Sequence, residues 1–322
     1  MLVIRCFMRK NLKMTLDPFS DLLKLLNAQS VLAGGLITGG KWAIEFPASD
    51  QIKFWGIVRG NCSLLMDGET SPITVGAGDI FLLRTPRSHI LASDLTLKSI
   101  HLAEILESRK GTIAYYGEGE EFFMIGGKVE LSDNSAQLLI DELPPMIHIR
   151  SASRHSPSLC WLLEQLVAEQ DGNYPGAGAA SSQLAHLMFI QILRAYFENV
   201  DPITSGRLRA MGDKRLAPAL QLMHGEPGHP WQLGELAKSA AMSRATFSAY
   251  FKTVAGVAPM AYLTDWRMRL AEHTLQNERV SVGALAMSLG YTSESAFSNA
   301  FKRVIGKSPR NYQRGLPARE PV

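Results

Sequence analysis

Residues 243–262 read SRATFSAYFKTVAGVAPMAY, and residues 293–312 read SESAFSNAFKRVIGKSPRNY. Nine of the twenty aligned positions carry the same residue in both stretches. Chance gives about one such match over this length, so the two stretches indicate a duplicated structural unit. This unit occupies the last third of the 322-residue chain.

Each copy predicts a helix with one apolar side and a defined end. In the first copy, Phe247 and Phe251 are four residues apart and a valine follows three residues later, which places an apolar stripe on one helix face. Gly256 stands where such a helix ends in a left-handed residue. Pro259 then suits the first turn of the next helix. The second copy repeats all of these residues fifty positions later.

A further amphipathic helix is expected before each copy, at LGELAKSA (233–240) and at VGALAMSL (282–289). Helix, tight turn and helix form the helix-turn-helix unit, whose second helix can enter the DNA major groove. Those second helices are expected at 243–254 and 293–304. Residues 259–276 between the copies predict one helix of about 27 Å, which suits two major-groove contacts about 34 Å apart. A helical bundle or solenoid is the alternative, but two repeats are too few for a solenoid.

Residues from about 213 to 314 resemble the DNA-binding domain of the AraC/XylS family of transcriptional regulators. The residues that carry the resemblance are Leu236-Ala237, Met242-Ser243-Arg244, Phe247, Phe251-Lys252, Leu285-Ala286, Gly290-Tyr291, Ser295, Phe297-Ser298, Phe301-Lys302, Gly306 and Ser308-Pro309. The resemblance implies a sequence-specific regulator, more commonly an activator than a repressor.

The faces opposite the two apolar stripes supply the predicted DNA contacts. They carry Arg244, Ala245, Thr246, Ser248, Ala249 and Lys252 in the first helix, and Glu294, Ser295, Ala296, Ser298, Asn299, Lys302 and Arg303 in the second. Hydroxyl and amide side chains can bond base edges, and alanines can pack on thymine methyl groups. Lys252, Lys302 and Arg303 are expected on phosphates.

Two of these residues keep alternative interpretations. Arg244 suits either a base or a phosphate. Glu294 is either a helix-start residue favoured by the helix dipole or a reader of cytosine.

The basic charge of the chain is concentrated in the duplicated region. From Asp213 onward there are 14 Lys and Arg against 8 Asp and Glu, a net charge of +6. The remainder has 19 against 22, a net charge of −3, which together give the +3 of the whole chain. Excess basic charge in one domain favours double-stranded DNA as its partner, because DNA binding neutralises phosphates.

The first half of the chain predicts short β-strands. Between residues 31 and about 131, β-branched runs are separated by Gly, Pro, Asn and Asp, which suggests a small jelly-roll barrel. The runs lie at 41–46, 52–60, 62–68, 71–86 and 89–93. Isolated glycine pairs at 34–35, 39–40 and 126–127 are interpreted as turns rather than phosphate-binding loops.

This half resembles the cupin-like sensor domain of one branch of AraC-type regulators. The matching stretches are DPFSDLLKLL (17–26), Gly40-Lys41-Trp42, Arg59-Gly60, Ala77-Gly78-Asp79 and residues 139–149. The expected fold is therefore α+β, with a cupin-like barrel followed by an all-α DNA-binding domain.

The barrel offers few candidates for other chemistry. Cupins often hold a metal through histidines, and His89 and His101 are the candidates here, but a metal needs three or four ligands. No metal or other cofactor is expected, and His89 is interpreted as a hydrogen-bonded residue of the barrel. Cys62 is either a redox sensor or a buried, inert thiol. The three scattered cysteines suit a reducing compartment.

Helices are expected at 17–27, 156–170 and 181–198, and the last is apolar around much of its girth. Such a helix packs either on the barrel and its sister helix or in a dimer interface. The expected organisation is residues 1–13 as a tail or upstream-start extension, 14–200 as the sensor and dimerisation domain, 201–212 as a linker, 213–315 as the DNA-binding domain, and 316–322 as a tail.

The sequence thus predicts a one-component transcriptional regulator, an activator that responds to a small molecule or stress signal. Its expected partners are DNA, RNA polymerase, an effector and a second copy of the chain. It is expected in the cytoplasm at the nucleoid. No apolar run approaches the length of a membrane span. The alternatives are a metal-dependent cupin enzyme fused to a DNA-binding domain, and a constitutive DNA binder whose barrel only dimerises. No nucleophile elbow, Walker loop or HExxH supports an enzyme.

Overall fold

The computed structural model describes residues 17–84, 86–107, 109–131, 137–172, 174–199 and 206–315. The chain forms two compact units. Residues 27–199 make the first, the β unit. The second, the helical unit, joins the N-terminal segment ending at Leu26 to the chain from residue 200 onward. The expected tails at 1–13 and 316–322 lie outside the described residues.

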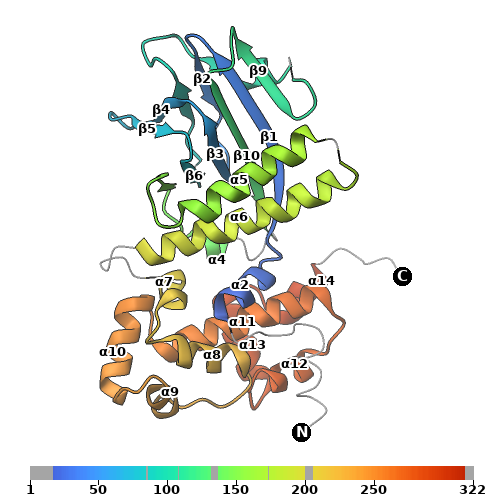
Figure 1. Ribbon diagram of the computed structural model, residues 1–322. Helices are drawn as coiled ribbons and strands as arrows, with labels where there is room; N and C mark the ends of the chain where they lie inside the picture. Colours follow the sequence, from blue (N-terminus) through green and yellow to red (C-terminus); the bar gives the residue numbers. More distant parts are fainter. Residues whose placement is uncertain are drawn as a thin grey trace. The chain divides into compact units, whose positions relative to one another are not determined.

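The β unit is built on two sheets (Figure 1). The six-stranded sheet has the order β11-β6-β3-β10-β1-β9, and the five-stranded sheet has the order β5-β4-β7-β2-β8. Their strands are β1 (Gln29–Gly39), β2 (Ala43–Phe46), β3 (Ile52–Arg59), β4 (Asn61–Met66), β5 (Ile73–Gly76), β6 (Ile80–Leu83), β7 (His89–Ala92), β8 (Ile100–His101), β9 (Ile113–Gly117), β10 (Phe122–Glu130) and β11 (Met146–Ile149). The predicted strand runs between residues 41 and 93 are confirmed.

Side chains from both sheets form one apolar core. Among its members, Ile44, Leu64 and Phe81 are fully buried. Short helices α3 (Leu102–Leu106) and α4 (Gln137–Ile140) complete the β-rich part of the unit. The barrel interior is thus occupied by aliphatic and aromatic side chains, as expected for a structural core.

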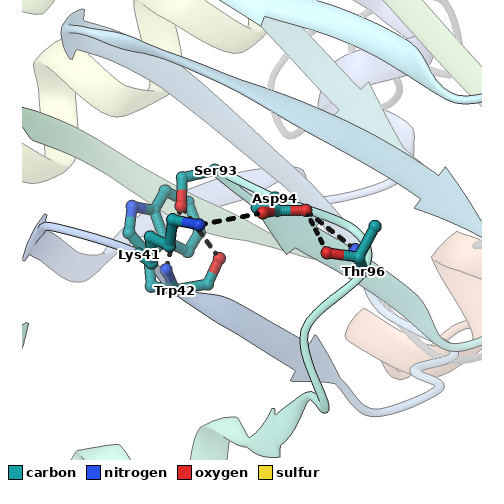
Figure 2. A network of polar contacts seen from close by, with 5 residues as sticks. All are labelled: Lys41, Trp42, Ser93, Asp94 and Thr96. Carbon is teal, nitrogen blue, oxygen red and sulfur yellow. Dashed lines mark hydrogen bonds and ion pairs between the residues drawn. The ribbon is translucent and has the colours of Figure 1, made fainter.

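A polar network fixes the start of β2 to the turn after β7 (Figure 2). The backbone N of Trp42 donates to Ser93 Oγ at 2.9 Å, and the backbone N of Ser93 donates to the carbonyl of Trp42 at 2.9 Å. Asp94 accepts from the backbone N and the hydroxyl of Thr96, and it lies 3.7 Å from Lys41 Nζ. These contacts hold Trp42, which is buried as a member of the core.

Two glycine pairs predicted as turns lie inside strands instead. Gly34 and Gly35 belong to β1, Gly126 and Gly127 belong to β10, and Gly34 is the register partner of Gly126. A Cβ on Gly126 would lie 2.3 Å from the ring of Trp55 on β3. Glycine is needed there because the neighbouring aromatic ring lies directly against the strand backbone.

Helices α5 (Ser156–Asp171) and α6 (Ala177–Asn199) lie along the six-stranded sheet (Figure 1). Helix α6 packs on β1 and on α5. Of the two expected arrangements, this is packing on the barrel and on the sister helix. Helix α5 approaches β3 where Gly56 leaves room for the side chain of Leu163. Trp161 and Leu187 remain exposed on this helix pair.

The helical unit contains both predicted helix-turn-helix units. Its elements are α2 (Pro18–Leu25), α7 (Arg207–Gly212), α8 (Ala217–Gly225), α9 (Leu233–Ser239), α10 (Arg244–Ala255), α11 (Pro259–Asn277), α12 (Val282–Ser288), α13 (Glu294–Ile305) and α14 (Pro309–Arg314). The pairs α9–α10 and α12–α13 are the helix-turn-helix units, and α11 is the predicted connecting helix. In the described part of the chain, no helix is long and apolar enough to span a bilayer.

Helix α2 forms as predicted but belongs to the helical unit. Asp17 caps it by accepting from the backbone N of Phe19 at 3.1 Å. The expected domain 14–200 placed this helix with the barrel, whereas it packs on α7, α8 and α11. Asp21 is fully buried there, with Oδ2 4.0 Å from Nδ1 of His224 on α8. The amphipathic pattern of 17–27 predicts a buried face, but not the partner that covers it.

The expected linker at 201–212 is also shorter than predicted. Its second half forms α7, in which Leu208 and Ala210 are buried, and the backbone N of Gly206 donates to the carbonyl of Val254 at 2.9 Å. The helical unit therefore begins before residue 213, and residues 200–205 lie outside the described part of the chain.

Candidate nucleic-acid interface

The second helices of the two helix-turn-helix units, α10 and α13, are held by equivalent aromatic clusters. The ring centroids are 5.6 Å apart for Phe247–Phe251, 5.5 Å for Phe251–Tyr262, 5.8 Å for Phe297–Phe301 and 5.7 Å for Phe301–Tyr312. All four phenylalanines are fully buried. The apolar stripe of each copy therefore faces the core, as predicted, and each helix presents its opposite side outward.

The ends of α10 and α13 are also equivalent. Ser243 and Ser293 each accept, through Oγ, from the backbone N three residues later at 3.2 Å. Gly256 and Gly306 adopt left-handed conformations with φ of 74° and 84°. These caps fix the length of each helix, because a side-chain oxygen closes one end and a glycine terminates the other.

None of the predicted contact residues is buried. Three of them are half-buried, namely Ser248, Glu294 and Ser298. The others are exposed: Arg244, Ala245, Thr246, Ala249, Lys252, Ser295, Ala296, Asn299, Lys302 and Arg303. The Thr246 hydroxyl is 2.8 Å from Ser243 Oγ, within the cap of α10. The structure thus brings each predicted set onto one accessible helix face.

Glu294 forms an ion pair that sequence spacing does not reveal. Its Oε1 lies 2.8 Å from Nη2 of Arg310, which belongs to α14. Glu294 is the first residue of α13, where the helix dipole favours a carboxylate. Both observations favour the helix-start interpretation over cytosine reading. Arg310 was not among the predicted residues because its proximity depends on how α14 folds back.

An open hollow of about 640 Å³ lies beside Arg244 at the first helix-turn-helix turn. It is lined by Gln232, Gly234, Glu235, Ala237, Lys238, Ala241, Met242 and Arg244. A Cβ on Gly234 would lie 2.8 Å from Nε of Arg244, so this glycine gives the guanidinium room against α9. Lys238 adds a second cationic side chain to this hollow, and it lies outside the predicted faces of α10 and α13.

The comparisons with known proteins agree with this architecture. The sequence profile of the cupin family matches residues 17–198, and that of the helix-turn-helix domain matches residues 236–315. An AraC-like transcription regulator of Streptomyces antibioticus is 37% identical over 299 residues, which cover 93% of this chain and 99% of that protein. The chain belongs to the AraC family.

This AraC-family chain has further relatives of the same kind. The transcriptional activator RclR of Escherichia coli, described as RCS-specific, is 28% identical over 92% of this chain and 97% of its own length. Among solved structures, the DNA-binding domain of AdpA in complex with a target DNA is 29% identical, covering 32% of this chain and 92% of that one with a TM-score of 0.30.

The AraC-family chain is thus a DNA-binding transcriptional regulator with an N-terminal cupin domain. The S. antibioticus and E. coli relatives are transcriptional regulators rather than enzymes. This finding, together with the apolar side chains that occupy the barrel, sets aside the alternative of a cupin enzyme fused to a DNA-binding domain.

The two candidate metal ligands of the AraC-family cupin domain lie on opposite faces of one sheet. His89 is the register partner of Phe46, and His101 is the partner of Glu45. Successive residues of β2 point to opposite faces, so His89 is buried whereas His101 is exposed, 3.7 Å from Glu45. Among the described residues, no group of three or more His, Cys, Asp or Glu side chains could hold a metal.

The prediction that His89 is hydrogen-bonded was wrong. Within the described chain neither ring nitrogen has a hydrogen-bond partner, and the ring stacks on Phe46 with centroids 4.9 Å apart. Burial, together with the charge of Lys53, lowers the pKa of His89 to about 4. The imidazole is therefore neutral at physiological pH and packs like an aromatic residue.

Cys62 is also buried in the barrel core. Burial raises the pKa of its thiol to about 12, so the reactive thiolate is not populated near neutral pH. This environment favours the interpretation as an inert thiol over the one as a redox sensor.

Proposed function

We propose that this chain is a one-component transcriptional activator whose helices α10 and α13 enter adjacent major-groove segments of one DNA duplex. One observation carries the proposal: each copy of the repeat buries its aromatic stripe and exposes its polar face. Helices with exposed polar faces, capped by serine and held by a rigid core, are suited to contact base edges.

In this proposal the residues divide by chemistry. Asn299, Ser295 and Ser298 read base edges, and Ala245 and Ala296 pack on thymine methyl groups. Thr246, Ser248 and Ala249 lie on the corresponding face of α10. Lys252, Lys302 and Arg303 neutralise phosphates and fix the register of the protein on the duplex. Arg244 contacts either a base or a phosphate, and Glu294 holds the start of α13.

The proposed signal reaches the protein through its cupin unit, as a small molecule or a stress signal. The name of the E. coli relative, an RCS-specific activator, supports both activation and a chemical signal. The proposed partners are DNA, RNA polymerase, an effector and a second copy of the chain. The proposed place of action is the cytoplasm, at the nucleoid.

Footprinting of purified full-length protein on genomic fragments tests the proposal. Two adjacent protected segments, about one helical turn apart, are expected at each bound site. Transcription in vitro from a bound promoter should then rise when the protein is added. A single short protected segment would contradict the use of both helices, and reduced transcription would contradict activation.

A further inference from the structure

The two helix-turn-helix units meet at a junction on α11, which contacts both α10 and α13. The first unit packs on the start of α11 through Tyr262 and Leu263. The second packs on α11 through α13, and the following helix α14 is tied to the later part of α11, where Nε2 of Gln276 donates to the hydroxyl of Tyr312 at 2.7 Å. Between these two regions lies Arg267.

The guanidinium of Arg267 joins the two units. Its Nε donates to the carbonyl of Pro227 at 2.6 Å, and Nη2 donates to the carbonyl of His229 at 2.8 Å. Both carbonyls belong to the loop that leads into α9, the first helix of the first unit. The same guanidinium lies 5.9 Å from the ring centroid of Tyr291, in the turn of the second unit. Fixed donor geometry allows arginine, unlike lysine, to hold these groups together.

The backbones of the two units also touch beside this guanidinium. A Cβ on Gly228 would lie 2.1 Å from the carbonyl oxygen of Ser288, and a Cβ on Gly290 would lie 2.5 Å from the carbonyl oxygen of Gly228. Such distances leave no space for any side chain at either position. The loop of the first unit and the turn of the second are therefore in direct backbone contact.

We propose that Arg267, with Tyr291 and the Gly228–Gly290 contact, forms an interlock that fixes the relative orientation of α10 and α13. The interlock sets the spacing between the two DNA segments that the protein accepts. Arg267 acts as a positioning residue, because its Nε and Nη2 donate to protein carbonyls. The inference rests on the proposed use of both helix-turn-helix units on one duplex.

Spacing is a sensitive readout because DNA is helical. One inserted base pair moves a half-site by about 3.4 Å and rotates it by about 34°. Two rigidly joined helices cannot follow both changes, so one of them loses contacts. Without the interlock, the two helices can adjust more easily to the shift and the rotation of the half-site. The preference of the protein for the original spacing then falls.

The experiment uses full-length protein and a duplex selected from a randomised library. The dissociation constant is measured for this duplex and for versions with one base pair inserted or deleted between the two protected segments. Wild type is expected to bind the original spacing at least about tenfold more tightly, which corresponds to about 1.4 kcal/mol. In Arg267→Met this ratio should fall to about threefold or less.

Three further variants separate positioning from other roles. Arg267→Lys keeps the charge but not the fork, so it should behave like Arg267→Met; rescue by lysine would instead indicate a phosphate contact and overturn the proposal. Gly228→Ala forces the two backbones apart and should change the preferred spacing. Gly225→Ala is the matched control, because its Cβ would meet nothing within 4 Å, and it should retain the wild-type preference.

The outcomes distinguish this inference from the function on which it rests. If wild type protects only one segment, the two-site binding mode fails. If it protects two segments but Arg267→Met and Gly228→Ala both keep the wild-type spacing preference, the interlock fails. Should Arg267→Met not fold, as judged by its thermal unfolding, Arg267→Lys and Gly228→Ala still decide the question.

Discussion

Asn299 is the strongest candidate for a base-reading residue, since it is an amide that is not buried on the outer face of α13. We expect Asn299→Ala to relax the preference at one base position by about 1–3 kcal/mol, because an amide can bond adenine through two hydrogen bonds. Selection from a randomised duplex library, followed by sequencing, measures this preference. Asn277→Ala, at the end of α11, serves as the control and should leave it unchanged.

A loss of affinity that is equal on all DNA sequences would contradict the prediction for Asn299. If Asn299→Ala weakens binding equally on every sequence, the side chain positions the protein and does not read a base.

Lys302 lies in the last turn of α13 and is exposed. We expect Lys302→Ala to reduce the salt dependence of DNA binding by about one released ion, because one phosphate contact is lost. The slope of log K against log salt concentration measures this number. Lys41→Ala in the β unit also removes an exposed charge and should not change the slope. A slope that is unchanged in Lys302→Ala would remove this residue from the phosphate contacts.

At the scale of elements, α2 is separated in sequence from the helices it packs on. Leu25 is fully buried in α2. We expect Leu25→Ala to lower the free energy of unfolding of the helical unit by about 2–5 kcal/mol, as for other buried leucines. Hydrogen exchange should show lower protection in α8 and α11, with β3 and β4 unaffected. Lys24→Ala, at an exposed position of the same helix, should change stability by less than about 0.5 kcal/mol.

The opposite pattern of exchange would contradict the assignment of α2. If protection falls in β3 and β4 while α8 and α11 keep theirs, the helix belongs to the β unit, as the sequence alone suggests.

The elements that can be predicted from sequence are those with strong local periodicity. Helices α10 and α13 have aromatic residues at helical spacing, a serine cap and a terminal glycine, and all three signals agree. Strands with paired glycines, such as β1 and β10, are harder to predict. Gly126 has a reason to be glycine only once Trp55 lies against it, and this contact is not visible in the local sequence.

The exposed faces of the candidate interface can be predicted for the same reason. The residues that hold its helices in place cannot. Which face of α10 or α13 is exposed follows from the position of the phenylalanines. Arg310 and Arg267, in contrast, act through partners on other elements. Their proximity results from tertiary packing, for which a single sequence carries no spacing signal.

At the scale of the whole molecule, the two units each contain a buried neutral histidine. Burial lowers the pKa of His224 in the helical unit to about 3, and burial with the charge of Lys53 lowers that of His89 in the β unit to about 4. An unfolded histidine has a pKa of about 6.5. Between these values the unfolded state binds a proton that the folded state does not, so stability falls as the pH falls below about 6.5.

We expect His89→Phe to reduce this acid sensitivity in the β unit alone. The slope between pH 6.5 and 4 should decrease by up to about 1.4 kcal/mol per pH unit, because one proton uptake is removed. Phenylalanine preserves the stacking on Phe46. Hydrogen exchange of β3 and of α11, measured at pH 7 and pH 5, follows the two units separately. If β3 keeps its full acid sensitivity in the variant, His89 does not titrate in this window on unfolding.

The position of α2 also bears on how the polypeptide is made. The helix is translated before α8 and α11, and the stretch between α2 and α8 is more than half the length of the chain. At about 5–20 residues per second, its leucines wait roughly 10–50 s for the surface that covers them. Truncated polypeptides would expose this apolar face to chaperones and proteases, so the surface that covers α2 is complete only in a chain translated through α11.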